Sequence, residues 1–292
     1  MGSFTLLLAC IEALGSEVPQ EGSEDTLSQD SEVQDSGTED SGTEDTGTEA
    51  PDYSQAGPFS HQTSSGSSSM ATGCNLNYRV VSPSNPTGRA LLAHGFMRSG
   101  DNMMGWAEHL ASWGLEVWVP DLCWSGGFNA DPEKNAQDIA ELMGTGPVAL
   151  AGHSAGALAV LLADHQLQVK ALVGLDPVEQ MGQDNSSVGA AVQTPTLSIF
   201  GEPGSCNSDN SGVSFYGAVP GVLLLDLQGA DHCDFESPTD GLCEALCTAN
   251  DGAWTDEERR DALAALVTSW LLQEHTEQIL GGILASGVTA ER

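Results

Sequence analysis

The sequence has very few basic residues. Lysine and arginine together number 8 against 42 aspartates and glutamates, which gives a formal net charge of −34 over 292 residues. The first basic residue is Arg79, and the only lysines are Lys134 and Lys170. Because a phosphate backbone is bound through clustered cations, this composition argues against a nucleic-acid partner. It predicts a protein that stays soluble through its charge.

Long hydrophobic runs are also missing, so the sequence offers no candidate for a bilayer-spanning helix. The first ten residues nevertheless resemble the end of a bacterial lipoprotein signal, because Leu7-Leu8-Ala9 precedes Cys10. They lack the cationic start and the longer apolar segment of a secretory signal. We expect export, either as a bacterial surface protein whose only membrane contact is a lipid on Cys10 or as a secreted protein. The alternative is an artefactual start followed by a disordered tail.

Residues 11–70 show no apolar periodicity and contain a five-residue acidic repeat. Ser36-Gly37-Thr38-Glu39-Asp40 recurs almost unchanged over residues 41–49. Such a segment cannot bury enough surface to offset its chain entropy, so it is predicted to be a disordered, self-repelling linker. Calcium or partner binding by the repeat is the alternative. Residues 71–292 are long enough for one catalytic domain with a single core.

Six cysteines remain when Cys10 is set aside, and an even number in an exported protein predicts disulfides. No C-x-x-C pair or histidine cluster favours a zinc site, and no metal or other cofactor is expected. The sequence does not decide the pairing, although proximity in the predicted fold favours Cys206 with one of Cys233, Cys243 or Cys247. The six are Cys74, Cys123, Cys206, Cys233, Cys243 and Cys247.

Apolar runs alternate with helical patterns through the remainder of the chain. Strands are predicted at 76–81, 89–94, 115–120, 148–152, 169–175, 196–200 and 222–227, and helices at 102–113, 131–143, 155–165 and 256–274. This alternation predicts an α/β fold in which a mostly parallel central sheet carries helices on both faces. Ligands of such a sheet bind outside the carboxyl ends of its strands.

A predicted strand and a predicted helix enclose Gly152-His153-Ser154-Ala155-Gly156. Strand, sharp turn and helix in this order are typical of a nucleophile elbow, where a strained backbone lifts the serine hydroxyl above the sheet. The small residues two before and two after the serine let strand and helix pass each other. Ser154 is therefore predicted to be a catalytic nucleophile. The alternative is a Gly/Ser turn that only joins the two elements.

A serine hydroxyl needs a base to accept its proton and a carboxylate to orient that base. His232 is the candidate base because it lies in a loop after the last core strand, whereas His153 is expected to point away from the serine. Asp176 is the candidate acid, since the more usual position after the following strand holds Gly204. Asp176 is otherwise a turn residue before proline, and the alternative acids are Glu202 and Asp209.

Hydrolysis also needs donors for the oxyanion. The backbone N–H groups of Ala155 and Phe96 are the candidates, because Ala155 follows the nucleophile and Gly95 allows a close backbone approach beside Phe96. His94 is expected to be structural. Segment 177–193 is too short for a large lid, so an open cleft is predicted. Phe96, Trp124 and Phe235 are candidates to border it and to contact the substrate.

These segments resemble the α/β-hydrolase superfamily over residues 74–272. Chlorophyllases and platelet-activating-factor acetylhydrolases are similar in the early acid of Leu-Asp-Pro-Val. Bacterial cutinase-like polyester hydrolases are similar in the His-Gly-aromatic segment and in a cysteine just after the catalytic histidine, but they carry the acid one strand later. The resemblance implies an α/β-hydrolase fold and a serine esterase. It is carried by His94-Gly95-Phe96, Gly152-His153-Ser154-Ala155-Gly156, Gly174-Leu175-Asp176-Pro177-Val178 and Asp231-His232.

The residues and the resemblance together predict a monomeric enzyme that cleaves carboxylic esters, small or polymeric, through a Ser-His-Asp triad and an acyl-enzyme. A polyester hydrolase of the cutinase type or a lipid-ester hydrolase is the alternative within this class, and thioester, amide or transacylase chemistry would use the same residues. The alternative outside the class is a catalytically inactive hydrolase-fold module that binds a ligand or partner.

Overall fold

A computed structural model describes residues 49–247 and 253–292. Cys10, the predicted signal remnant at 1–10 and most of the predicted linker lie outside the described residues. Among the helices that the structure describes, none combines the length and the apolar character that a bilayer crossing requires.

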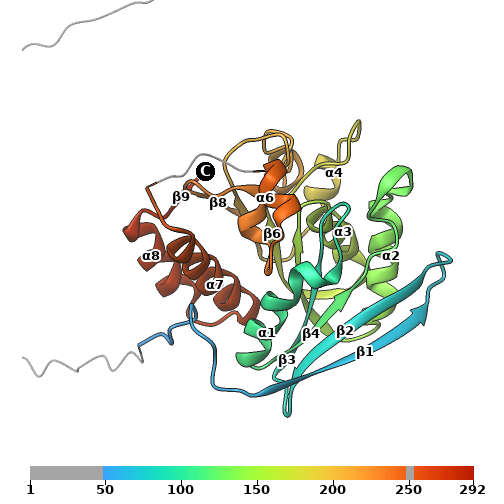
Figure 1. The fold of residues 1–292 in the computed structure, drawn as a ribbon, viewed down its shortest axis with the longest axis horizontal. Coiled ribbons are helices and arrows are strands. Elements are labelled where there is room, and N and C mark those ends of the chain that lie inside the picture. The colour runs from blue at the N-terminus through green and yellow to red at the C-terminus, as the bar shows by residue number, and fades with distance from the viewer. Residues whose placement is uncertain (1–48, 248–252) are drawn as a thin grey trace, which may run out of the picture. The chain divides into compact units, whose positions relative to one another are not determined.

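The described residues form a nine-stranded sheet in the order β1-β2-β4-β3-β5-β6-β7-β8-β9 (Figure 1). Neighbouring strands are parallel from β4 through β8, whereas β1, β2 and β9 join the sheet in antiparallel pairs. The strands are β1 His61–Ser69, β2 Asn75–Pro83, β3 Gly88–Ala93, β4 Leu115–Pro120, β5 Pro147–His153, β6 Gln168–Leu175, β7 Thr196–Phe200, β8 Leu223–Leu227 and β9 Thr289–Glu291.

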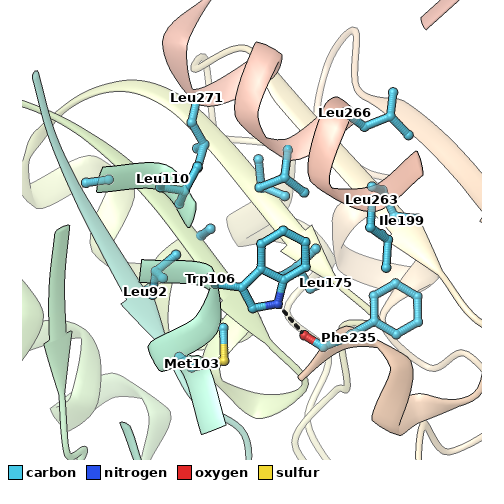
Figure 2. Close-up of a cluster of buried hydrophobic side chains, with 14 of the residues drawn as sticks. Leu92, Met103, Trp106, Leu110, Leu175, Ile199, Phe235, Leu263, Leu266 and Leu271 are labelled. Carbon is cyan, nitrogen blue, oxygen red and sulfur yellow. Dashed lines mark hydrogen bonds between the residues drawn. The ribbon is translucent and has the colours of Figure 1, made fainter. Parts of the chain in front are cut away.

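Helices cover both faces of this sheet (Figure 1). One core cluster lies between the sheet and helices α1 and α7, and Trp106 and Leu266 belong to it (Figure 2). The other lies beneath α2 and α3. The helices are α1 Met104–Ser112, α2 Pro132–Met143, α3 Ala155–Ala163, α4 Ser186–Gly189, α5 Val213–Tyr216, α6 Gly241–Cys247, α7 Asp256–Leu272 and α8 Thr276–Ser286.

The central strands are buried on both sides, which explains their continuous apolar sequences. In β5, Ala149 and Ala151 face the α1 and α7 side, whereas Val148 and Leu150 face the α2 and α3 side. The predicted α/β class with a mostly parallel sheet and helices on both faces is confirmed, and the predicted strands lie where the structure has β2 to β8.

The start of α2 also agrees with its sequence signals. The Asp131 carboxylate accepts a hydrogen bond of 3.0 Å from the backbone N–H of Lys134, and Pro132 occupies the first turn. An acceptor at the N-cap and a proline just inside the helix satisfy or remove N–H groups that lack an intrahelical partner. The sharp start of α2 keeps the preceding loop, with Trp124, at the carboxyl edge of the sheet.

The predicted domain boundary at residue 71 is too late. Strand β1 lies inside the predicted linker, yet all of its nine residues pair with β2. Further upstream, Tyr53 is only 1% exposed and its ring packs on Trp113 with centroids 4.6 Å apart. Strand β1 escaped prediction because an edge strand is held by backbone hydrogen bonds and needs few apolar side chains. The folded part therefore includes residues 49–70.

Two further elements near the C-terminus were not predicted. The helix expected to reach residue 274 ends at Leu272, because Gln273 and His275 adopt left-handed conformations with φ of 59° and 54°. The chain then forms α8 and returns as β9 along the edge of β8. Short breaks of this kind carry no strong signal when the breaking residue is not glycine.

The inclusion of residues 49–70 in the fold is testable by truncation. A chain that starts at residue 71 should unfold at least about 4 °C below a chain that starts at residue 49, because it loses β1 and the buried Tyr53 ring. Differential scanning calorimetry measures the difference. Tyr53→Phe in the longer chain is the control, since it keeps the ring and removes only a hydrogen bond of 3.3 Å to Glu274. Equal unfolding temperatures for the two chains would contradict the boundary.

Candidate active site

Ser154 lies on the sharp turn between β5 and α3 with a positive φ of 56°. Its N–H donates to the Leu175 carbonyl of β6 over 2.9 Å, and its own carbonyl accepts from Ala157. A β-carbon on Gly152 would lie 2.4 Å from the Gly156 carbonyl oxygen, so the turn admits no side chain there. These features agree with the predicted elbow, because a left-handed serine is strained and persists only where the surroundings hold it.

Asp176 follows β6 directly and is completely buried. Its Oδ1 accepts a hydrogen bond of 3.0 Å from the backbone N–H of Gly201, which follows the neighbouring strand β7. Its Oδ2 lies 2.6 Å from Nδ1 of His232. The structure therefore brings the predicted acid and the predicted base together. The alternative acid Glu202 accepts the N–H of Gly229, and neither Glu202 nor Asp209 bonds to His232 within the part of the chain that the structure describes.

Asn207 is a site residue that the sequence analysis missed. It is 1% exposed, and its Nδ2 donates to Asp176 Oδ2 over 3.1 Å and to the Glu202 carbonyl over 2.8 Å. Its Oδ1 accepts from the N–H groups of Gly204 and Asn210, so the side chain is fixed at both ends. A buried carboxylate needs such donors. The sequence signal is weak, because asparagine is ordinary in a Gly/Ser-rich loop.

His232 opens a short 3₁₀ turn, His232–Phe235, that follows β8 and is capped by Asp231. The Asp231 carboxylate accepts from the N–H of Cys233 over 2.7 Å and from that of Asp234 over 3.2 Å. This cap fixes the backbone of the imidazole-bearing residue. The ring itself is largely buried and contacts Asp176 through Nδ1, which leaves Nε2 for a second partner.

His153 does not point away from the site as predicted. Its ring packs against that of His232 with centroids 4.5 Å apart, and its Nε2–H donates to the His232 carbonyl over 3.0 Å. β5 still pairs with β6 at His153, and the prediction failed because the loop that carries His232 contacts the His153 ring there. Burial, together with the positive charge of a protonated His232, holds the pKa of His153 well below its usual value. His153 is thus a neutral support under the base.

No hydrogen bond joins Ser154 Oγ to His232 among the described residues. His153 links the two residues, because it precedes the serine in the chain and its ring contacts the His232 ring. Catalytic hydrogen bonds are often long or misaligned without substrate and tighten only in the reacting complex. Asp176 meanwhile holds the imidazole through Nδ1, which is the orientation that a serine base requires.

The two predicted oxyanion donors have no acceptor within the described chain. The N–H of Ala155 lies in the first turn of α3, where helical N–H groups lack an internal partner. The N–H of Phe96 lies in the loop after β3, beside Gly95, whose added β-carbon would approach Ser154 Cβ to 2.9 Å. His94 supports this loop as expected, since its ring contacts the Gly95 carbonyl at 2.9 Å and accepts from the Leu122 N–H at 2.9 Å.

A cavity of about 420 Å³ opens beside Ser154 and Ala155, and Phe96 and Trp124 line it as predicted. The Trp124 indole is held in place because its Nε1 donates to Asp138 over 3.1 Å while the Lys134 ammonium lies 4.2 Å from its ring centroid. The remaining apolar lining comes from Ala130, Pro132, Leu158, Val178 and Met181.

Phe235 is not part of this cavity, so its predicted contact with substrate is wrong. The side chain is fully buried in the core on the α1 and α7 side, and its carbonyl accepts a hydrogen bond of 3.0 Å from Trp106 Nε1 (Figure 2). The 3₁₀ turn that carries His232 turns its last residue inward. Phe235 therefore anchors the histidine loop, and the sequence position alone does not distinguish an anchor from a cavity wall.

An ion pair joins the oxyanion loop to the histidine loop. The Glu236 side chain is fully buried and accepts from Arg98 Nε over 2.6 Å, with a second contact to the other guanidinium nitrogen. Burial raises the pKa of Glu236, and Arg98 opposes that rise. Since Arg98 follows Phe96 and Glu236 follows His232 closely in sequence, this pair fixes the oxyanion donor and the base relative to each other. It is not evident from the sequence.

The six cysteines form three disulfides, Cys74–Cys123, Cys206–Cys247 and Cys233–Cys243. The expectation that Cys206 pairs with one of the last three is confirmed, and thiolate ligation of zinc by these sulfurs does not apply. Helix α6 carries Cys243 and Cys247, whose partners directly follow His232 and directly precede Asn207. One helix therefore secures the loop that carries His232 and the loop that carries Asn207, which donates to Asp176. Three disulfides also indicate an oxidising location such as the extracellular space.

The Arg98–Glu236 pair should show strong energetic coupling. Arg98→Met should lower the free energy of unfolding by about 3 kcal/mol or more, because it leaves the buried Glu236 carboxylate without its partner. Glu236→Leu should lower it by less, because Arg98 keeps a second ion pair with Asp240 at 3.1 Å. The double variant should lose clearly less than the sum, because no unpaired charge remains. Urea unfolding of the four proteins measures the coupling. Additive losses would show that the pair does not tie the loops together.

His153 should contribute to the pH dependence of stability. Its pKa lies below the ordinary 6.5 in the folded state, so the unfolded chain binds the additional proton. His153 should therefore make its full contribution to the free energy of unfolding at a pH above its ordinary pKa, and this contribution should decrease as the pH falls. Between about pH 7.5 and about pH 5, His153→Gln should lose less stability than the parent chain. The low-pKa histidines His94 and His109 remain in both proteins, so equal losses would refute the assignment.

Comparisons with family models and with curated proteins do not assign this chain to a family. The chain matches no protein-family model, and no curated protein is significantly similar to it. Any statement about function therefore rests on the arrangement of Ser154, Asp176 and His232 and on the cavity beside them.

Proposed function

We propose that this chain is a serine hydrolase of carboxylic esters, built on an α/β-hydrolase fold, with Ser154, His232 and Asp176 as its triad. The observation that carries the proposal is the hydrogen bond of 2.6 Å between His232 and Asp176, at the same edge of the sheet as a serine in a left-handed conformation. Ser154, Asp176 and His232 follow β5, β6 and β8 at this edge, and they have the chemical types that activate a serine.

In the proposed reaction, Ser154 Oγ attacks the ester carbonyl carbon while His232 Nε2 takes the hydroxyl proton. The negative charge that develops on the carbonyl oxygen accepts hydrogen bonds from the N–H groups of Phe96 and Ala155. His232 then gives the proton to the alcohol oxygen, the carbon–oxygen bond breaks, and an acyl-enzyme remains on Ser154. Asp176 stabilises the protonated imidazole throughout.

Water completes the cycle by the same route. His232 takes a proton from water as its oxygen attacks the acyl carbon, and the proton returns to Ser154 Oγ when the carboxylic acid leaves. The buried neutral His153 holds the His232 backbone without competing for this proton, since its own pKa is low. Every proton transfer in the scheme therefore passes through one imidazole.

Hydrolysis of a polyester or of a lipid ester is a second candidate, favoured by the access to the site. The connection between β6 and β7 contains only the four-residue helix α4, so this connection provides no large lid over the cavity. The apolar walls provided by Trp124 and Leu158 suit an acyl or aromatic group. The alternative of an inactive binding module is less well supported, because the sequence retains a candidate nucleophile, base and acid.

We also propose that the protein works outside the cytoplasm as a monomer. The three disulfides support the first part of this proposal. A lipid on Cys10, which would tether the enzyme to a bacterial surface, remains a prediction from the sequence. The strongly acidic balance also speaks against a nucleic-acid partner.

The triad is tested by turnover of a soluble nitrophenyl ester. Ser154→Ala should lower kcat by about 10⁴-fold or more, and Asp176→Asn by about 10³-fold or more, because the second change removes the charge that stabilises the imidazolium. Glu202→Gln is the matched control, since it alters a nearby carboxylate that bonds Gly229 instead of His232. It should retain kcat within a few-fold.

Circular dichroism confirms that each variant is folded. Unchanged turnover in folded Ser154→Ala would overturn the proposal. A larger loss in Glu202→Gln than in Asp176→Asn would move the acid to the loop after β7.

A further inference from the structure

Exposed apolar side chains gather around the mouth of the cavity. The described residues contain five strongly exposed large hydrophobic side chains, and four of them lie at this opening or beside it. We call these four the apolar rim. Its members, with their exposed fractions, are Phe96 at 44%, Met97 at 71%, Met181 at 98% and Leu246 at 66%.

The position of each rim residue follows from its contacts. Phe96 and Met181 line the cavity themselves. The N–H of Met97 donates over 2.7 Å to the carbonyl of Ser125, which is another lining residue. Leu246 lines a small adjoining hollow that contains His232 and shares the lining residue Cys206 with the cavity. The rim therefore draws on three segments, namely the loop after β3, the β6–β7 connection and α6, around two adjoining hollows.

Met97 and Leu246 lie outside the cavity wall, so an ester small enough to enter the cavity does not need them. Apolar side chains grouped around a binding site and left exposed to water usually mark a surface for a partner or ligand. Here the group is continuous with the opening that leads to Ser154. We therefore expect that the ligand that covers the rim and the ester that enters the cavity belong to the same material.

The negative charge of the protein limits the kinds of surface that can cover the rim. The cavity is lined by the carboxylates Asp131 and Glu179 and by no lysine or arginine, and the whole chain carries a net charge of −34. An anionic membrane or a polyanion is repelled by such a protein, and the Lys134 ammonium over Trp124 is already paired with Asp131 at 3.3 Å. An uncharged apolar surface avoids this repulsion.

We propose that the apolar rim adsorbs the protein onto the surface of an uncharged, water-insoluble ester, with Ser154 facing that surface. This inference rests on the proposed esterase function and adds the physical form of the substrate. The rim is exposed among residues 49–247 and 253–292, so adsorption requires no opening of these residues. Hydrolysis then occurs on a segment of ester that enters the cavity from the adsorbed surface.

Adsorption is measured apart from catalysis with the full chain carrying Ser154→Ala. The probes are micronised neutral polycaprolactone and vesicles of anionic phosphatidylglycerol, and depletion of protein from solution gives the binding. We expect adsorption to the polyester and none to the vesicles. The rim variant Met97→Asn/Leu246→Gln should lower the adsorption constant about tenfold or more, because two apolar contacts are lost. Asparagine tolerates the positive φ of 57° at Met97.

Phe59→Asn provides the matched control. Phe59 is 45% exposed but packs near Gly114, just before β4, at the opposite edge of the sheet from Ser154. This variant should adsorb like the parent. Equal adsorption by the rim variant and the parent, or an equal loss in Phe59→Asn, would overturn the inference. Stronger capture by the anionic vesicles than by the polyester would do so as well.

A second arm separates this inference from the proposed function. With Ser154 intact, the rim variant should cleave soluble nitrophenyl acetate at the parental rate while releasing products from polycaprolactone about tenfold more slowly. A parallel loss on both substrates would contradict a role in adsorption. A parent chain that cleaves no soluble ester would overturn the esterase proposal, whatever the adsorption measurement shows.

Discussion

The site depends on one buried hydrogen bond, from His232 to the carboxylate of Asp176. A carboxylate that is removed from water must be compensated by donors, and here these come from His232, from Gly201 and from Asn207. Gly201 and Asn207 lie in the loop after β7, and His232 lies in the loop after β8. The structure around the site consists largely of devices that keep these loops together, namely two disulfides through α6, the Arg98–Glu236 pair and the buried anchor Phe235.

The sequence predicts the central part of this fold well for a physical reason. The strands from β3 to β8 are covered on both faces, so each must be apolar and each shows a clear signal. The turn at Ser154 is equally visible, because steric contact at Gly152 admits only small residues. Elements at the margins lack such a requirement. Strand β1 is held through its backbone, so its serine-rich sequence resembles a linker.

The residues of the candidate site likewise fall into a group that the sequence identifies and a group that it does not. Ser154, Asp176 and His232 are identifiable because each has a distinct chemical type at a strand end. Asn207, His153 and Glu236 are not, because their importance lies in contacts between loops that are distant in sequence. Phe235 was assigned to the site wrongly. Its position three residues after His232 suggested a cavity wall, but its side chain packs in the core (Figure 2). Contacts that depend on loop geometry cannot be derived from residue type alone.

The central claim is that Ser154 is an activated nucleophile, and covalent labelling tests it most directly. The folded protein is treated with a fluorophosphonate, and mass spectrometry locates the adduct. The account predicts a single adduct on Ser154 that is lost when the protein is unfolded and is strongly slowed in His232→Ala. An unlabelled Ser154 in folded protein, or labelling at the same rate without the imidazole, would contradict it.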